Sequence, residues 1–390
     1  MALTDKGRIA LGYIKEYFPD EAFTAKELTD KCGVKIVGAT LNSIVNNGYL
    51  TKLGGSPVQY QPIDDFEELI KAMEEEKNSK GCITSTNLRE ARKNKNDEFY
   101  TRYEDIEAEV MKYREQFKDK VVYLPCDDPA EKKSEFWSFF VDNFDAFGLK
   151  KLIATHYEEN GKAYKIWIDG DTSNDGFVND GDAQQEDLQG NGDFRSPECV
   201  AIMNECDIVC TNPPFSLFRE FVDTIMKADK KFLIIGNKNA FTYIKIFKLI
   251  KENKIWTGYN MVKQFKQPDG SIKKFGNICW FSNMTTIKYN EEFVLTKEYN
   301  PINYPKYDNY DAIEVDRIAN IPKDYYDVMG VPITFIDKYN PNQFEILGHT
   351  SSSDKSPEVE ALRTNPKYRN RGFINGKEKY DRVLIRRKKI

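Results

Sequence analysis

A strand that ends in two prolines constrains this chain more than any other feature of its sequence. The run from Ile208 to Phe215 begins with apolar residues and ends in Asn212-Pro213-Pro214-Phe215. Each proline fixes φ and removes an N–H donor, and the residue before a proline is held extended. We therefore expect a rigid corner there, whose backbone carbonyl groups face outward as hydrogen-bond acceptors.

Such a corner suits the recognition of a planar amino group. The Asn212 side-chain oxygen and the Pro213 carbonyl can each accept one hydrogen of an exocyclic NH2 group. The Phe215 ring can stack on the base that carries this group. The competing interpretation is a strand that merely ends in a Pro-Pro turn, because short motifs often match by chance.

Strands and helices alternate on both sides of this motif. Strands are predicted over residues 121–124, 151–155, 164–168, 207–211 and 231–236, and helices over 136–144, 197–204 and 218–227. This alternation predicts an α/β fold with a doubly wound, Rossmann-like sheet, whose ligands bind at the carboxyl ends of the strands. The motif stands at such an end, which favours a functional role for it.

Two further regions stand apart from this alternation. Residues 169–193 hold eight acidic residues and no Lys or Arg, and they predict a long, solvated surface excursion rather than a metal site. Residues 363–389 hold eleven Lys or Arg against two acidic residues, a surplus that fits contact with phosphate groups. The alternation over residues 382–386 predicts a strand within this basic segment.

The first 63 residues predict a small separate α+β domain. Three short helical patterns are followed by a hairpin over residues 49–61, which is the order of a winged helix. Thr24 and Glu27 have the spacing of a capping box at the start of the second helix. Residues 64–95 are predicted to be a helical linker. Fold alone does not decide whether such a domain binds DNA or another protein, and we favour DNA.

Composition argues against several classes of protein. Seven cysteines without metal-type spacing and only two histidines predict no metal site. The chain has no run of about 18 apolar residues, so no membrane span is expected. Its start lacks a signal-peptide pattern, which predicts a cytoplasmic protein. The net charge of −5 does not by itself indicate nucleic-acid binding.

Several motifs in one order carry a resemblance to a known family. They are Asn-Asp-Glu-Phe-Tyr-Thr from residue 96, Cys-Asp-Asp-Pro from 126, Leu-Ile-Ala-Thr-His-Tyr from 152, Thr-Asn-Pro-Pro-Phe-Ser from 211, and Ile-Asn-Gly-Lys with Arg-Val-Leu-Ile-Arg-Arg near the end. From about residue 94 onward, the chain resembles the EcoRI-type family of S-adenosylmethionine-dependent DNA adenine N6-methyltransferases. The resemblance implies a methyltransferase domain over residues 96–390, with target-recognition elements around 240–345 and a basic segment over 363–390.

The resemblance also implies which residues hold S-adenosylmethionine. They are Phe99, Tyr100, Thr101, Asp127, Asp128, Pro129, His156, Asp193 and Phe194. A carboxylate at 127 or 128 would pair with the ammonium group of the cofactor, although these residues could instead cap the following segment. Asp193 would accept a hydrogen bond from the amino group of the cofactor's adenine. His156 lies near the expected position of the ribose.

The implied reaction is direct methyl transfer to an adenine flipped out of double-stranded DNA, with Asn212, Pro213, Pro214 and Phe215 as the catalytic motif. Two alternatives stay open. The motif could hold the planar amine of RNA or the amide of a protein glutamine, or the domain could be inactive in a DNA-binding regulator. A cognate restriction endonuclease is a further partner that the resemblance suggests.

Overall fold

The computed structural model divides the chain into two compact units, Met1–Cys82 and Ile83–Ile390. The structure describes residues 5–18, 21–32, 36, 38–46, 49–53, 57–63, 99–126, 135–158, 162–267, 270–351, 354–365, 368 and 371–389. The linker predicted over residues 64–95 lies outside the described residues. Each unit is therefore defined by its own internal packing.

The described part of the first unit contains helices around a small sheet. Its elements are α1 (Asp5–Tyr17), β1 (Phe23–Thr24), α2 (Ala25–Cys32), α3 (Gly38–Asn46), β2 (Leu50–Leu53) and β3 (Gln59–Pro62), with the strand order β1-β3-β2. The Thr24 N–H donates to the Glu27 carboxylate at 2.7 Å, and the Glu27 N–H donates to the Thr24 hydroxyl at 3.2 Å. These bonds confirm the predicted capping box. The two-residue strand β1 is too short for a sequence pattern to predict.

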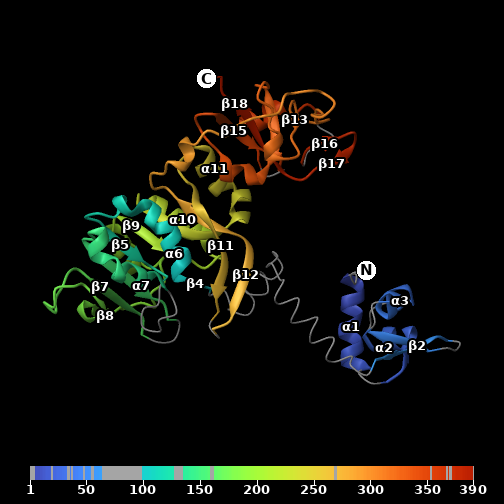
Figure 1. The fold of residues 1–390 in the computed structure, drawn as a ribbon, viewed down its shortest axis with the longest axis horizontal. Coiled ribbons are helices and arrows are strands. Elements are labelled where there is room, and N and C mark those ends of the chain that lie inside the picture. Colours follow the sequence, from blue (N-terminus) through green and yellow to red (C-terminus); the bar gives the residue numbers. More distant parts are fainter. Residues whose placement is uncertain are drawn as a thin grey trace. The chain divides into compact units, whose positions relative to one another are not determined.

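A nine-stranded sheet organises the described part of the second unit, in the order β4-β11-β12-β10-β9-β5-β6-β7-β8 (Figure 1). The central strands are parallel to one another: β10 (Lys231–Asn237), β9 (Ile208–Thr211), β5 (Val121–Leu124) and β6 (Lys151–His156). Strand order reverses between β5 and β9, so their carboxyl ends border a crevice.

Antiparallel strands extend this sheet on both sides. They are β7 (Tyr164–Ile168) and β8 (Gln184–Asp187) beyond β6, and β12 (Ile272–Ser282), β11 (Trp256–Lys266) and β4 (Tyr100–Thr101) beyond β10. The sheet is therefore mixed: its centre has the parallel strands expected of a doubly wound α/β sheet, and the strands on both sides are antiparallel. Short connections join β6 to β7 and β11 to β12, and a short connection can only produce an antiparallel pair.

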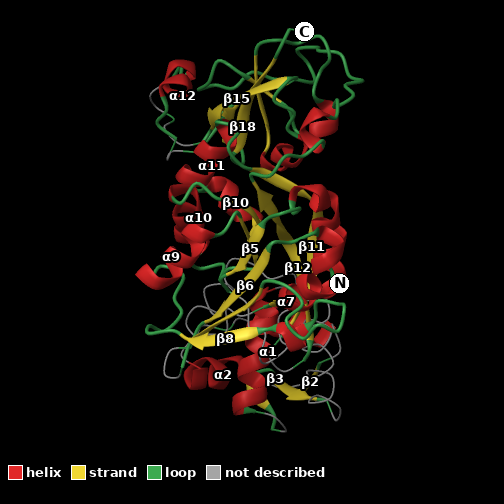
Figure 2. Ribbon diagram, turned by 90° about the vertical axis from the view of Figure 1, so that its left-hand side faces the viewer, coloured by secondary structure: helices red, strands yellow, loops and turns green. Residues whose placement is uncertain are grey.

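Helices cover both faces of the sheet. Figure 2 shows α9 (Pro197–Glu205), α10 (Phe218–Lys227) and α11 (Ile244–Lys251) on one side of the central strands and α7 (Glu135–Asp142) on the other. Helices α6 (Tyr103–Val110) and α8 (Phe144–Phe147) share the core cluster of α7. The single helix predicted over 136–144 is thus two helices, separated at Asn143.

A second, smaller sheet forms the C-terminal part of this unit. It contains β13 (Ile313–Glu314), β14 (Val328–Pro332), β18 (Arg382–Arg387) and β15 (Phe344–His349), in that order. The predicted strand in the basic segment is therefore confirmed as β18. Shorter elements are α12 (Pro357–Leu362), β16 (Phe373–Ile374), β17 (Lys377–Glu378) and the 3-10 helices η1 (Met111–Gln116), η2 (Asp180–Asp182), η3 (Lys238–Thr242), η4 (Lys288–Asn290), η5 (Ile318–Asn320) and η6 (Ile333–Lys338).

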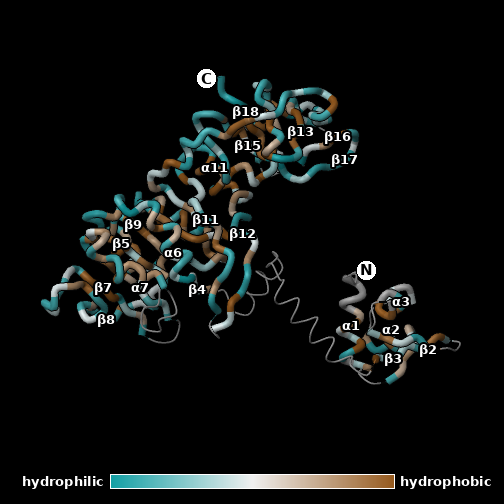
Figure 3. The backbone as a smooth tube through the Cα atoms, viewed as in Figure 1, coloured by the Kyte–Doolittle hydropathy of each residue, from teal (hydrophilic) through white to brown (hydrophobic). Residues whose placement is uncertain are grey.

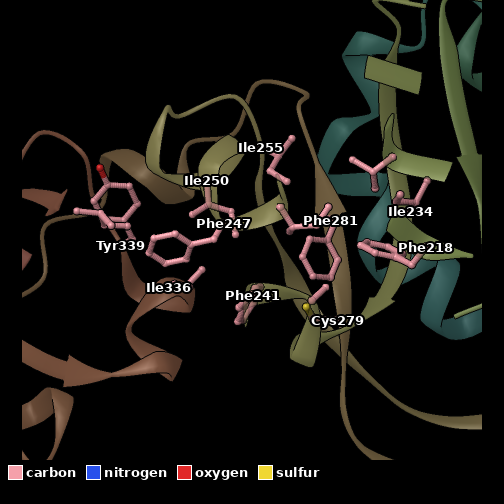
Figure 4. Packing of buried hydrophobic residues seen from close by; sticks show 14 of the residues in the cluster. Phe218, Ile234, Phe241, Phe247, Ile250, Ile255, Cys279, Phe281, Ile336 and Tyr339 are labelled. Atoms are coloured by element: carbon pink, nitrogen blue, oxygen red, sulfur yellow. The ribbon is translucent and has the colours of Figure 1, made fainter. Parts of the chain in front are cut away.

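One continuous apolar core joins the two sheets. The Phe281 ring of β12 lies 5.0 Å from the Phe218 ring and 5.5 Å from the Phe241 ring, measured between centroids. Figure 4 shows this cluster continuing through Phe247 to Ile336, close to the smaller sheet. Figure 3 shows hydrophobic stretches along the strands and hydrophilic ones in the connecting loops. The shared core fixes the smaller sheet against the domain that carries the motif.

The acidic segment over residues 169–193 is more ordered than we predicted from sequence. It contains η2 and the edge strand β8, which pairs with β7. Asp182 is buried, and its carboxylate accepts hydrogen bonds from the backbone N–H groups of Thr172, Ser173 and Asn179. Most residues of the segment are exposed, in agreement with the predicted surface excursion, but composition does not reveal that one of its acids is buried and satisfies the N–H groups of a turn.

Acid is expected to weaken the second unit through Asp182. Its hydrogen bonds with backbone N–H groups lower its pKa from 3.8 to about 2. The stabilisation by this carboxylate is therefore complete well above pH 4 and is lost as the pH falls toward 2. Asp182→Asn should lower the Tm at pH 6, and the difference from wild type should shrink between pH 5 and pH 2. Circular dichroism melts would measure this, and a difference that stays constant with pH would contradict it.

Candidate active site

A cavity of about 290 Å³ lies at the carboxyl ends of β5, β6 and β9, where the strand order reverses. It brings together predicted site residues from distant parts of the sequence: Phe99, Tyr100, Thr101, His156, Asp193, Phe194, Asn212, Pro213, Pro214 and Phe215. Asp127, Asp128 and Pro129 lie outside the described residues. Pro125 and Cys126, which directly precede them, line the cavity.

The Asn212 amide has a defined orientation in this cavity. Its nitrogen donates a hydrogen bond to the Phe99 carbonyl oxygen at 2.5 Å. Because a carbonyl can only accept, the amide nitrogen must face Phe99 and the amide oxygen must face away from it. That oxygen is buried and has no hydrogen-bond partner among the described residues. A buried acceptor without a partner is costly in a folded protein, so it marks a place where a ligand can donate.

Two threonine hydroxyls beside Asn212 share this property. The Thr101 and Thr211 hydroxyls are buried and have no hydrogen-bond partner within the described part of the chain. Thr101 lines the cavity from the edge strand β4, and Thr211 directly precedes Asn212 at the end of β9. The unsatisfied Thr101 and Asn212 atoms both belong to residues that line the cavity, which is the arrangement that a polar ligand would complete.

A cluster of four phenylalanine rings backs the motif. The Phe215 ring stacks on the Phe99 ring with their centroids 6.0 Å apart. Phe265 of β11 and Phe275 of β12 lie edge-on to both rings, with centroids 4.7–6.4 Å away. None of the four rings is more than 8% exposed. Packing from the β11–β12 hairpin therefore holds Phe215 in place and makes this side of the cavity apolar.

Asp193 already has a partner in this structure. Its two carboxylate oxygens accept from the Arg195 guanidinium at 2.9 and 2.6 Å, and Arg195 also pairs with Glu220 at 2.9 Å. The hydrogen bond from Arg195 lowers the pKa of Asp193, which keeps this carboxylate ionised. Any cofactor amino group would have to share the carboxylate with Arg195. Arg195 was not among the residues predicted for the site, although its position two residues after an acid is a signal for such a pair.

His156 ends β6 at the rim of the cavity. Its ring stacks on the Tyr164 ring with centroids 5.0 Å apart, and its Nε2 atom lies 3.8 Å from the Glu158 carboxylate. The next residue, Tyr157, lines the cavity and is 48% exposed. Tyr157 offers an aromatic surface that the sequence analysis did not single out, because an aromatic residue after a strand carries no specific signal.

The part of the chain that forms this cavity matches a known family in sequence. The family described as adenine-specific methyltransferase EcoRI matches residues 87–388. This chain belongs to the EcoRI methyltransferase family. Members of the family transfer a methyl group from S-adenosylmethionine to adenine in DNA, and this chain is accordingly a DNA adenine methyltransferase. The first unit lies outside the matched residues.

The chain is similar in sequence to three Type II methyltransferases over nearly their whole length. M.EcoRI of Escherichia coli is 41% identical over 338 residues, which cover 79% of this chain and 98% of that protein. M.MgeORF184P of Mycoplasma genitalium and M.MpnI of Mycoplasma pneumoniae are each 37% identical over 326 residues, covering 77% and 76% of this chain and 98% and 97% of those proteins. No solved structure matches the chain.

The lining of the cavity fits S-adenosylmethionine. The partnerless Thr101 and Asn212 atoms can bind polar groups of the cofactor or the substrate, and aromatic rings on the same cavity can contact the adenine of the cofactor. Within the described part of the chain, no group of three or more His, Cys, Asp or Glu is placed to hold a metal ion. Nor is any described helix long and apolar enough to cross a membrane.

The Thr101 hydroxyl provides a test of the cofactor site. Thr101→Val keeps the shape of the side chain and removes a buried hydroxyl that has no hydrogen-bond partner among the described residues, so the Tm of the protein without cofactor should not fall. If the hydroxyl binds S-adenosylmethionine, the variant should bind it about tenfold more weakly, as expected for one lost hydrogen bond of about 1.4 kcal/mol. Calorimetric titration would measure this. An unchanged Kd would remove Thr101 from the site.

Proposed function

We propose that this chain methylates the N6 amino group of an adenine flipped out of double-stranded DNA at a specific site, with Asn212 and Pro213 as the two acceptors of the amino hydrogens. The buried Asn212 amide oxygen supports this most strongly, because the amide is oriented by the Phe99 carbonyl and its oxygen has no partner in the described part of the chain. A donor with two hydrogens would satisfy that oxygen and the Pro213 carbonyl together.

The arrangement of acceptors explains how this site would activate a weak nucleophile. The lone pair of an adenine amino nitrogen is delocalised into the ring. Two acceptors at Asn212 and Pro213 would favour a pyramidal nitrogen and stabilise the positive charge that develops on it. Because Pro213 and Pro214 make the backbone rigid, the acceptors need little reorganisation during the reaction. Bound S-adenosylmethionine supplies an electrophilic methyl group.

The aromatic cluster would position the substrate base. Phe215 would stack on the flipped adenine and exclude water from the nitrogen, and Phe99 would support Phe215 from behind. The cofactor would lie along the other residues of the cavity: Tyr100, Thr101, His156, Asp193 and Phe194. The undescribed Asp127, Asp128 and Pro129 are proposed to hold its amino-acid portion. In-line placement of nitrogen, methyl and sulfur accounts for most of the catalysis in this proposal.

Alternative substrates fit less well. A planar amide of glutamine or an amine of RNA could also bind between Asn212 and Pro213, but the EcoRI family acts on adenine in DNA. An inactive regulator would have no use for an intact Asn-Pro-Pro-Phe motif at the end of β9. We also propose a cytoplasmic location and a cognate endonuclease, since the relatives are Type II methyltransferases.

The proposal predicts a selective loss in Asn212→Ala. This variant should lower kcat by about 10²–10³-fold, the usual cost of losing one such acceptor or donor to the reacting group, while S-adenosylmethionine binding is retained. Labelled methyl transfer to mixed-sequence duplex DNA, followed by nucleoside analysis, would measure it. Asn277→Ala, at an exposed position of β12 outside the cavity, is the matched control. Label in RNA or protein but not in DNA would contradict the proposal.

For the first unit we propose a winged-helix fold that adds contacts to DNA. Its helix and hairpin order, and its place outside the matched family, suggest an added binding module. The basic C-terminal segment offers fewer charges to DNA than its sequence suggests. Several of its arginines form ion pairs inside the domain: Arg363 with Glu360, Arg371 with Asp381, Arg382 with Glu314 and Arg386 with Glu345.

Removing residues 1–82 tests the proposed role of the first unit. The remaining chain keeps the residues matched by the family, so kcat at saturating DNA should stay near that of the full chain. The Kd for DNA should rise, and the slope of log Kd against log salt should become shallower because phosphate contacts are lost. Unchanged affinity and slope would favour a protein partner for this unit.

A further inference from the structure

Lys273 lies over an aromatic ring that lines the proposed methyl-transfer cavity. It is on β12, directly opposite Phe265 of β11, and side chains that face each other across an antiparallel pair point to the same side of the sheet. Its ammonium nitrogen is 5.7 Å from the centroid of the Phe99 ring, which lines the cavity. Lys273 is therefore on the side of the hairpin that carries the phenylalanine cluster.

No carboxylate of the described residues pairs with Lys273. Lys266, on the neighbouring strand of the hairpin, is paired with Glu135. Lys273 takes part in no ion pair among the described residues and contacts the face of an aromatic ring instead. Its side chain is partly buried, so it has less freedom than a fully exposed lysine. A fixed, unpaired cation beside the pocket is well placed to receive an anion.

The hairpin offers an adjacent lysine in a different setting. Successive residues of a strand point to opposite sides of the sheet, so Lys274 faces away from the phenylalanine cluster. Lys274 is exposed and lies opposite Gln264. The two lysines carry the same charge, one residue apart, but only Lys273 lies beside the cavity. Comparing variants of Lys273 and Lys274 therefore separates a contact made beside the cavity from a general attraction of positive charge to DNA.

We propose that Lys273 is a positioning residue that binds the DNA phosphate flanking the flipped adenine. This inference rests on the proposed function. A base that leaves the stack must rotate its backbone, which brings the adjoining phosphate to the mouth of the pocket. An ammonium at that point would hold the rotated backbone by a charge-assisted hydrogen bond. The ring cluster would couple this contact to Phe215, because Phe99 touches both the lysine and that ring.

The test combines protein variants with a changed phosphate. Wild type, Lys273→Gln, Lys273→Arg and Lys274→Gln would be assayed for kcat/KM on duplex DNA carrying the methylated site mapped for wild type. A second duplex would carry a neutral methylphosphonate in place of the phosphate next to the target adenine. S-adenosylmethionine affinity would be measured for each variant, and 2-aminopurine fluorescence at the target position would report base flipping.

We expect Lys273→Gln to lower kcat/KM and the flipping signal roughly tenfold, and Lys273→Arg to restore most of both, because a guanidinium also binds phosphate. The methylphosphonate should cost wild type and Lys274→Gln a similar factor but cost Lys273→Gln almost nothing. Independent losses from the variant and the changed phosphate would overturn the inference. The inference would also be overturned if Lys273→Gln bound S-adenosylmethionine more weakly and still lost as much kcat/KM on the methylphosphonate duplex as wild type.

These outcomes are distinguishable from failure of the proposed function. If wild type places no methyl group on adenine in DNA, the proposed function fails, and the role of Lys273 fails with it. If wild type methylates adenine and Lys273→Gln behaves like Lys274→Gln, only the role of Lys273 fails.

Discussion

The hydrogen bond from the Asn212 amide to the Phe99 carbonyl is the constraint on which the site depends. It joins the end of β9 to the segment that leads into β4, two parts of the chain more than one hundred residues apart. It also decides which end of the amide is available. With the nitrogen occupied, the oxygen is left as a buried acceptor, and the two prolines that follow keep the neighbouring carbonyl in a fixed position.

The sheet brings these groups together. The parallel strands β5, β6 and β9 end at one edge, so the residues that follow them meet at the point where strand order reverses. The antiparallel hairpin β11–β12 then supports one side of the cavity, because Phe265 and Phe275 pack against Phe99 and Phe215. The hairpin also carries Lys273, so in our proposal the same element that supports the motif also binds the substrate.

Much of this could be predicted from sequence because it rests on local patterns. The Asn-Pro-Pro-Phe corner, the central strands and the capping box at Thr24 all follow from residue type and spacing. The antiparallel outer strands, the ion pair of Arg195 with Glu220 and the buried role of Asp182 could not be predicted in this way. Each depends on which segments pair in space, and neither periodicity nor composition records that.

The most direct test is a crystal structure of the protein with a non-reactive cofactor analogue and duplex DNA containing its mapped target site. The account predicts a flipped adenine whose N6 lies about 3 Å from both the Asn212 amide oxygen and the Pro213 carbonyl oxygen, with the Asn212 nitrogen still bound to the Phe99 carbonyl. An adenine bound elsewhere, or an Asn212 amide turned so that its nitrogen faces the base, would contradict it.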